Sequence, residues 1–150
     1  MKDSMSDNRS SQRRTIIGMA IAVFGFILFL MGTSPELFAV DRSPVIGFVQ
    51  VTVILIGLGI ICVGGYLSLI SMWNKKPRTI AADIGLRLIA TGYVVAVASG
   101  MADVFGFGSQ PFPYIPSFGH WQARGVLIGE LIIAVGFLLF LPPRSTKKVE

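Results

Sequence analysis

The sequence predicts an all-α membrane protein with four transmembrane helices, arranged as two tandem hairpins that are parallel repeats of each other. Two observations lead to this fold class. The 150 residues are 53% hydrophobic and only 14% charged, whereas a soluble domain carries about 25% charged residues. In addition, segment 50–69 recurs at 122–141, 72 residues later, with 10 of 20 positions identical. The chain therefore lacks the polar surface of a soluble globule, and its two halves are related in sequence.

The first half contains a basic tail and two apolar stretches. We expect residues 1–14, which carry four basic side chains, to form a cytoplasmic tail. The apolar run 15–32 can be the first span, since about 20 apolar residues cross a hydrocarbon core of about 30 Å. A second span from about 45 to 72 ends beside Trp73, an amphipathic side chain typical of the membrane–water interface. Residues 15–73 therefore form the first predicted hairpin.

A basic loop, 74–78, separates this hairpin from the second one, 79–141. The third span starts near residue 79, and its cleanly apolar part is 88–102. The following loop is rich in Gly, Pro and aromatic residues, which favour turns. The fourth span covers 120–141, and two prolines separate it from the basic tail of the final predicted segment, 142–150.

The distribution of Lys and Arg predicts the topology. The N-terminal tail has four, the central loop three and the C-terminal tail three, whereas the first outer loop has one and the second has none before Arg124. Because positive loops stay on the inner side, we expect both termini in the cytoplasm and a multi-pass location in the cell (cytoplasmic) membrane. Both hairpins then enter from the same side, unlike the inverted repeats of many transporters.

Glycines recur at seven-residue intervals within the spans, which places them on one face of each helix. In lipid, small residues let helix backbones approach closely. We expect a compact four-helix bundle packed through these glycines, and the alternative is that part of the glycine surface contacts another subunit. The predicted packing residues are Gly18, Gly25, Gly57, Gly64, Gly92, Gly129 and Gly136.

Glu130 is the one acidic residue deep in a predicted span. Its counterpart in the first half is Leu58, so the fold itself does not require a carboxylate there. A charge at that depth costs about 2.5–3.5 kcal/mol on insertion scales, and such residues are functional candidates. One hypothesis is a proton- or cation-responsive group. The alternative, which we prefer, is a protonated Glu130 that hydrogen-bonds a facing helix through Tyr93, Ser99 or a backbone carbonyl.

Two pairs of opposite charges lie near the predicted membrane boundaries. Asp83 and Arg87 are four residues apart and share a helix face, which predicts an ion pair on the cytoplasmic side. Asp103 and Arg124 both lie at the outer boundary. They either form a pair that closes the second hairpin or are solvated independently.

Gln50 and Gln122 occupy equivalent positions at the outer starts of the second and fourth spans. Their recurrence favours a shared role at helix entry, such as capping or loop anchoring. It does not indicate catalysis.

Several classes of function lack their sequence signals. The chain has none of the common protease, hydrolase, nucleotide or dinucleotide motifs, and no His, Cys, Asp or Glu cluster with metal spacing. Cys62 is the only cysteine and His120 the only histidine. The net charge of +5 is explained by basic residues that face anionic lipid headgroups. We therefore expect no enzyme activity, no metal, no cofactor and no nucleic-acid partner.

The second half resembles a pattern found in small uncharacterised bacterial membrane proteins with four spans. The resemblance covers mainly 87–141 and rests on the motifs D-V-F-G-F-G-S, F-G-x-W-Q and G-V-L-I-G-E. It implies a membrane protein, and no activity is attached to the pattern.

The sequence therefore favours a non-enzymatic structural or accessory membrane subunit that acts through helix–helix contacts. Its expected partners are the lipid bilayer and either further copies of the chain or a larger membrane complex. The alternative is a small oligomeric transporter or channel in which Glu130 responds to protons or cations.

Overall fold

The computed structural model describes residues 2–34, 47–73, 77–107 and 119–142. Within these ranges the chain forms four α-helices and no strand. Each helix contains a stretch long and apolar enough to cross a membrane, as a multi-pass membrane protein requires. The prediction of an all-helical chain with four spans is confirmed. The helices are α1 (Lys2–Thr33), α2 (Phe48–Met72), α3 (Ile80–Gly100) and α4 (His120–Phe140).

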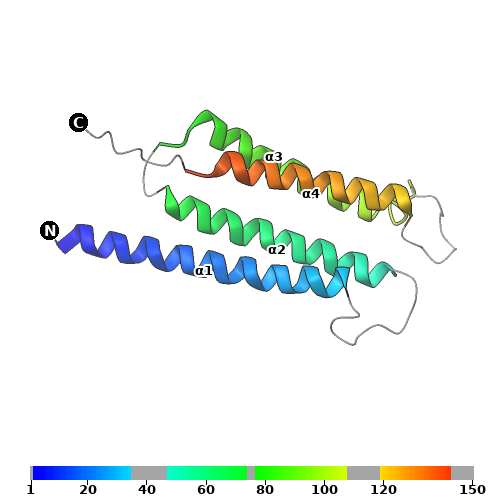
Figure 1. The fold of residues 1–150 in the computed structure, drawn as a ribbon, viewed down its shortest axis with the longest axis horizontal. Helices are drawn as coiled ribbons and strands as arrows, with labels where there is room; N and C mark the ends of the chain where they lie inside the picture. The colour runs from blue at the N-terminus through cyan, green and yellow to red at the C-terminus, as the bar shows by residue number, and fades with distance from the viewer. Residues whose placement is uncertain (1, 35–46, 74–76, 108–118, 143–150) are drawn as a thin grey trace.

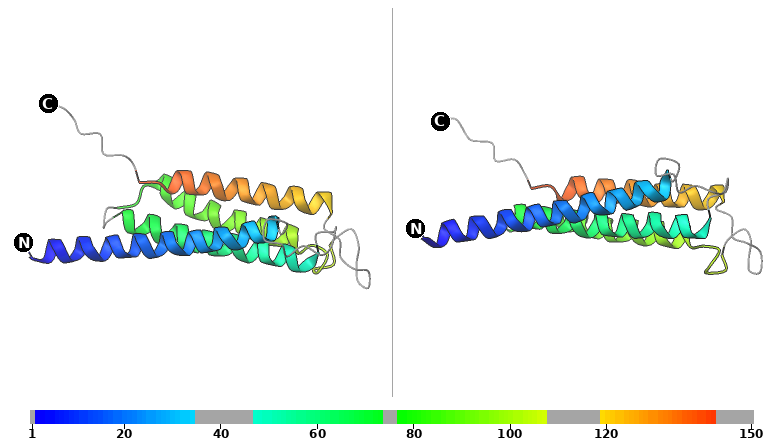
Figure 2. Two further views of the ribbon diagram at one scale, coloured as in Figure 1. Left: turned by 60° about the horizontal axis from the view of Figure 1, so that its bottom comes forward. Right: turned by 90° about the horizontal axis from the view of Figure 1, so that it is seen from below.

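α1 is longer than the predicted first span. The apolar part is Ser10–Thr33, but the helix begins at Lys2 and extends past the other three helices at that end (Figure 2). No Gly or Pro precedes Gly18, so nothing in the polar segment interrupts the helical backbone. The predicted span 15–32 is thus the inner part of a continuous helix.

The starts of α2 and α4 share one capping arrangement. The Gln50 side-chain oxygen accepts a hydrogen bond from the backbone N–H of Gly47 at 3.0 Å. The Gln122 oxygen accepts one from Gly119 at 2.8 Å. Both glutamines occupy the third helical position and satisfy the backbone donor of the N-cap glycine. The predicted helix-entry role of the two glutamines is confirmed.

The helices associate as two antiparallel pairs (Figure 1). α1 lies along α2, and α3 lies along α4; the two pairs meet through α2, which contacts α3 and, less extensively, α4. Within the described residues α1 contacts no helix except α2. The expected compact four-helix bundle is therefore wrong in one respect, because α1 lies at the edge of the assembly. Close contact between helix backbones is confined to the two hairpins.

Glycines bring the two helices of each hairpin into backbone contact. A Cβ added at Gly57 would lie 2.5 Å from the backbone N of Phe29 in α1. One added at Gly92 would lie 2.6 Å from the carbonyl O of Gly129 in α4. Both distances are too short for a Cβ, so only glycine permits these approaches. The same holds for the other predicted packing glycines, each against the partner helix of its own hairpin: Gly18, Gly25, Gly64, Gly129 and Gly136.

The two hairpins meet across an apolar core. Leu55 and Leu58 of α2, Ile89 and Ala96 of α3 and Ile133 of α4 are buried there together. At the end where the chain begins, the indole N–H of Trp73 donates to the carbonyl O of Phe140 at 3.1 Å. Trp73, predicted as an interfacial side chain, is 4% exposed and so ties the end of α2 to the end of α4.

Candidate functional site

Glu130 lies on the side of α4 that turns towards α2. It precedes Phe137 by seven residues, a step that keeps two side chains on one helix face. The Phe137 ring fills the space beside Gly65 of α2, where an added Cβ would lie 2.7 Å from the ring. Glu130 is half-buried. Its carboxyl group is therefore held at the margin between the protein interior and the surroundings of the helix.

No hydrogen bond or ion pair to Glu130 occurs among the described residues. Tyr93 donates instead to the carbonyl O of Leu55 at 3.4 Å, and Ser99 packs against Gly125. The expected hydrogen bond from Glu130 to a facing helix is wrong for both named side chains. They already point towards other groups, Tyr93 towards α2 and Ser99 towards the start of α4.

The predicted ion pair at the cytoplasmic boundary does not form. Asp83 and Arg87 are both exposed on α3, and no ion pair joins them in the part of the chain that the structure describes. An exposed pair of this kind gains about 0.3–0.5 kcal/mol, too little to hold two solvated side chains in one geometry. The two charges are available to other groups at this end of α3.

Asp103 and Arg124, the two charges predicted at the outer boundary, follow neither predicted alternative. Arg124 lies over the ring of Trp121, with its guanidinium carbon 5.2 Å from the ring centre, a cation–π contact between neighbouring turns of α4. Asp103 is only 8% exposed, so it is not solvated. Its Oδ1 atom is buried without a hydrogen-bond partner among the described residues. Asp103 and Arg124 therefore do not close the second hairpin.

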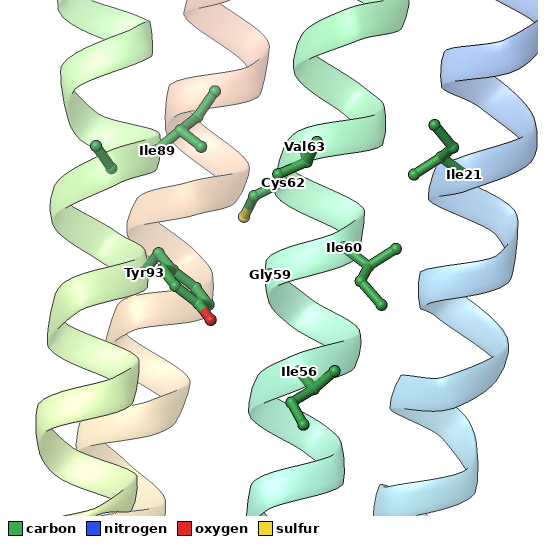
Figure 3. Close-up of a pocket in the computed structure, with 9 residues that line it drawn as sticks. Ile21, Ile56, Gly59, Ile60, Cys62, Val63, Ile89 and Tyr93 are labelled. Atoms are coloured by element: carbon green, nitrogen blue, oxygen red, sulfur yellow. The ribbon is translucent and has the colours of Figure 1, made fainter.

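An open apolar groove lies where α3 meets α2, with α1 beyond it (Figure 3). Its volume is about 470 Å³. The side chains of Cys62 and Tyr93 point into the space between α2 and α3, and Gly59 provides room for the phenol, whose oxygen would lie 2.7 Å from an added Cβ. The lining residues are Ile21, Ile56, Gly59, Ile60, Cys62, Val63, Ile89, Ala90 and Tyr93.

The groove was missed in the sequence because it depends on how the two hairpins meet. Of the lining residues, only Gly59, a glycine outside the seven-residue pattern of α2, indicates a close contact with another element. Apart from one thiol and one phenol the lining is hydrocarbon. Among the described residues no three His, Cys, Asp or Glu side chains gather as metal ligands do. This arrangement suits the binding of an apolar chain better than bond-making chemistry.

Comparison with family models, curated proteins and solved structures found no match to this chain. The resemblance of the second half to small bacterial membrane proteins stays a prediction.

Proposed function

We propose that this protein is a small, non-enzymatic accessory or structural subunit of the cell membrane that acts through helix–helix contacts. The observation that carries the proposal is the position of α1. This helix packs against α2 alone among the described helices, so most of its circumference is free. A helix at the edge of a small assembly is the natural place for a neighbouring transmembrane helix to bind.

The free side of α1 has a suitable shape for such a contact. Ile16, Met19, Val23 and Phe24 are each more than half exposed and surround Ala20. They form an open depression of about 500 Å³. Because lipid tails are as apolar as these side chains, helix association in membranes depends on close packing at small residues. Ala20 supplies the small residue in the middle of the depression.

We further propose that both termini are cytoplasmic and that the two hairpins are parallel repeats. Basic residues concentrate in the tails and the central loop. The start of α1 and the end of α4 lie at the same end of the molecule (Figure 1), as this topology requires. The recurring glutamine caps and glycine contacts support the relation between the halves.

Substitution of Ala20 tests the accessory function. Ala20→Trp fills the depression on α1 and should release a co-purifying membrane protein that elutes in fixed ratio with the wild type from mild detergent, as measured by native mass spectrometry. Ala134→Trp is the matched control, because Ala134 is also exposed within a span, on α4. Elution of the wild type alone, or equal loss of the companion in both variants, would contradict the proposal.

A second candidate function rests on Glu130. A half-buried carboxyl group without a partner among the described residues is an expensive feature for a transmembrane helix. We propose as the alternative a small oligomeric transporter or channel in which this group responds to protons or cations.

The transport alternative predicts pH-dependent flux in proteoliposomes. Glu130→Gln keeps the size of the side chain and removes its charge, so it should abolish this flux while the variant still folds. Folding is checked by gel filtration and helical circular dichroism in detergent. The alternative fails if the wild type carries no flux or if the variant carries as much as the wild type.

A further inference from the structure

The groove between the hairpins opens outwards, towards the surroundings of the membrane-spanning helices. Its outer rim includes Ile56 and Val63 of α2, which are 52% and 56% exposed. Neither residue belongs to the buried core between the hairpins. In a bilayer, the molecules that reach such an opening first are the acyl chains of the lipids.

The walls of the groove continue towards a basic end of the molecule. On α1, Arg14 precedes the lining residue Ile21 by seven positions and so lies on the same face. On α3, Arg87 precedes the lining residue Ala90 by three positions, or about 4.5 Å along the axis at 1.5 Å per residue. Both arginines are exposed. A positive charge therefore flanks the groove on either side.

Contacts between the helices place these two arginines towards the same end of the molecule. The Thr15 and Ser71 hydroxyls are 2.5 Å apart, which fixes the start of the α1 span beside the end of α2. Trp73, two residues further on, binds Phe140 of α4. A Cβ added at Gly85 of α3 would lie 2.9 Å from the backbone N of Phe140. Arg14 is adjacent to Thr15, and Arg87 follows Gly85 by two residues. Both arginines therefore lie towards this end of the molecule.

The charge at this end favours an anion. Among the residues whose exposure the structure describes, from residue 10 onwards, Asp83 is the one exposed acidic residue. It is opposed by four exposed arginines, which are Arg13, Arg14, Arg78 and Arg87. Arginine side chains can extend from a helix to the level of the headgroups, and they form strong charge-assisted hydrogen bonds with phosphate oxygens.

We propose that the groove binds one acyl chain of an anionic phospholipid, with Arg14 and Arg87 holding its phosphate. The groove volume of about 470 Å³ lies within the roughly 300–1,000 Å³ of small-molecule sites. Because the acyl chain leaves one hydrocarbon environment for another, its transfer gains little free energy. The shape of the groove positions the chain, and the two arginines bind the phosphate. The preference for an anionic headgroup arises because these positive charges repel a headgroup that carries its own cation.

The test uses the full chain in detergent, titrated with phospholipids that share dioleoyl chains and differ in headgroup. The first bound lipid is followed by native mass spectrometry. The wild type should bind phosphatidylglycerol roughly tenfold more tightly than phosphatidylcholine, because the arginines repel the choline cation beside the phosphate. Arg87→Gln should remove this preference, while Arg124→Gln, at the other end of the molecule, should keep it.

A second pair of variants tests the groove itself. Val63→Trp places an indole in the groove from an exposed position and should weaken phosphatidylglycerol binding about tenfold. Val135→Trp is the matched control, since Val135 is 48% exposed on α4 and outside the groove. Equal affinities for the two lipids, or equal effects of the two tryptophans, would overturn the proposal. Preference for phosphatidylethanolamine would also overturn it, because Asp83 would then hold the headgroup amine.

Discussion

At the scale of single residues, glycine decides how closely the helices approach. At Gly64 an added Cβ would collide with the backbone of Ala22, and at Gly57 with that of Phe29. These neighbours are main-chain atoms of α1 and cannot rotate away as a flexible side chain could. Even a methyl group must therefore separate the helices, which loses van der Waals contact along the whole hairpin.

Gly57→Ala should destabilise the protein by about 1–3 kcal/mol, the usual cost of overpacking a close contact. Unfolding in detergent mixtures, followed by tryptophan fluorescence, measures the change. Gly47→Ala is the control, since an added Cβ at Gly47 meets nothing within 4 Å. If the two variants have the same stability, the glycines are not needed for close approach.

The polar residues show that sequence patterns predict contacts between neighbouring residues of one helix better than contacts between two helices. Gln50 and Gln122 were predicted at helix starts because they recur and because a cap involves only neighbouring residues. Position at the same boundary was not enough to predict whether Asp103 and Arg124 form an ion pair, and they do not. Arg124 has a closer partner three residues earlier on its own helix, the Trp121 ring.

At the scale of elements, α1 is held to α2 by hydroxyl contacts at one end and by glycines along its length. The Ser11 hydroxyl donates to the carbonyl O of Ser71 at 2.8 Å, and Thr15 contacts the hydroxyl of the same serine at 2.5 Å. These bonds lie where the polar part of α1 meets its apolar part. They fix the polar extension of the helix to the rest of the molecule at this point.

Ser71→Ala should loosen this end of α1 without affecting α4. Loss of a hydrogen bond worth about 1 kcal/mol should speed amide hydrogen exchange roughly fivefold in the turn around Thr15. Thr52→Ala is the control, because the Thr52 hydroxyl bonds only to the carbonyl O of Phe48 in its own helix. Unchanged exchange near Thr15 would show that the glycine contacts alone fix α1.

At the scale of the whole molecule, the two helices within each hairpin pack closely along their length. The contact between the two hairpins is less extensive than the contact within either one. The buried core of α2, α3 and α4 provides this contact together with the Trp73–Phe140 hydrogen bond. Hydropathy was enough to predict the spans, and glycine spacing was enough to predict the helix faces that pack. The edge position of α1 and the groove depend on which faces of two separate hairpins meet, and no residue spacing within one helix encodes that choice.

Trp73→Phe should weaken the contact between the hairpins and leave each hairpin intact. Losing the bond from the indole N–H leaves the Phe140 carbonyl without this donor and should cost about 1–3 kcal/mol. Amide hydrogen exchange measured by mass spectrometry should show faster exchange at the ends of α2 and α4. The amides around the contact between Gly18 of α1 and Gly64 of α2 should stay as protected as in the wild type. Equal loosening throughout the molecule would show that the hairpins do not behave as separate units.

The pairing of α1 with α2 and of α3 with α4 also matters for how the protein is made. Each glycine contact that brings two helix backbones together joins helices that are consecutive in the chain. The ribosome adds roughly 5–20 residues per second, and the N-terminal part of a protein generally folds first. The first hairpin can therefore close in the bilayer while the second is still being translated. Only the smaller contact through α2 has to wait until synthesis is complete.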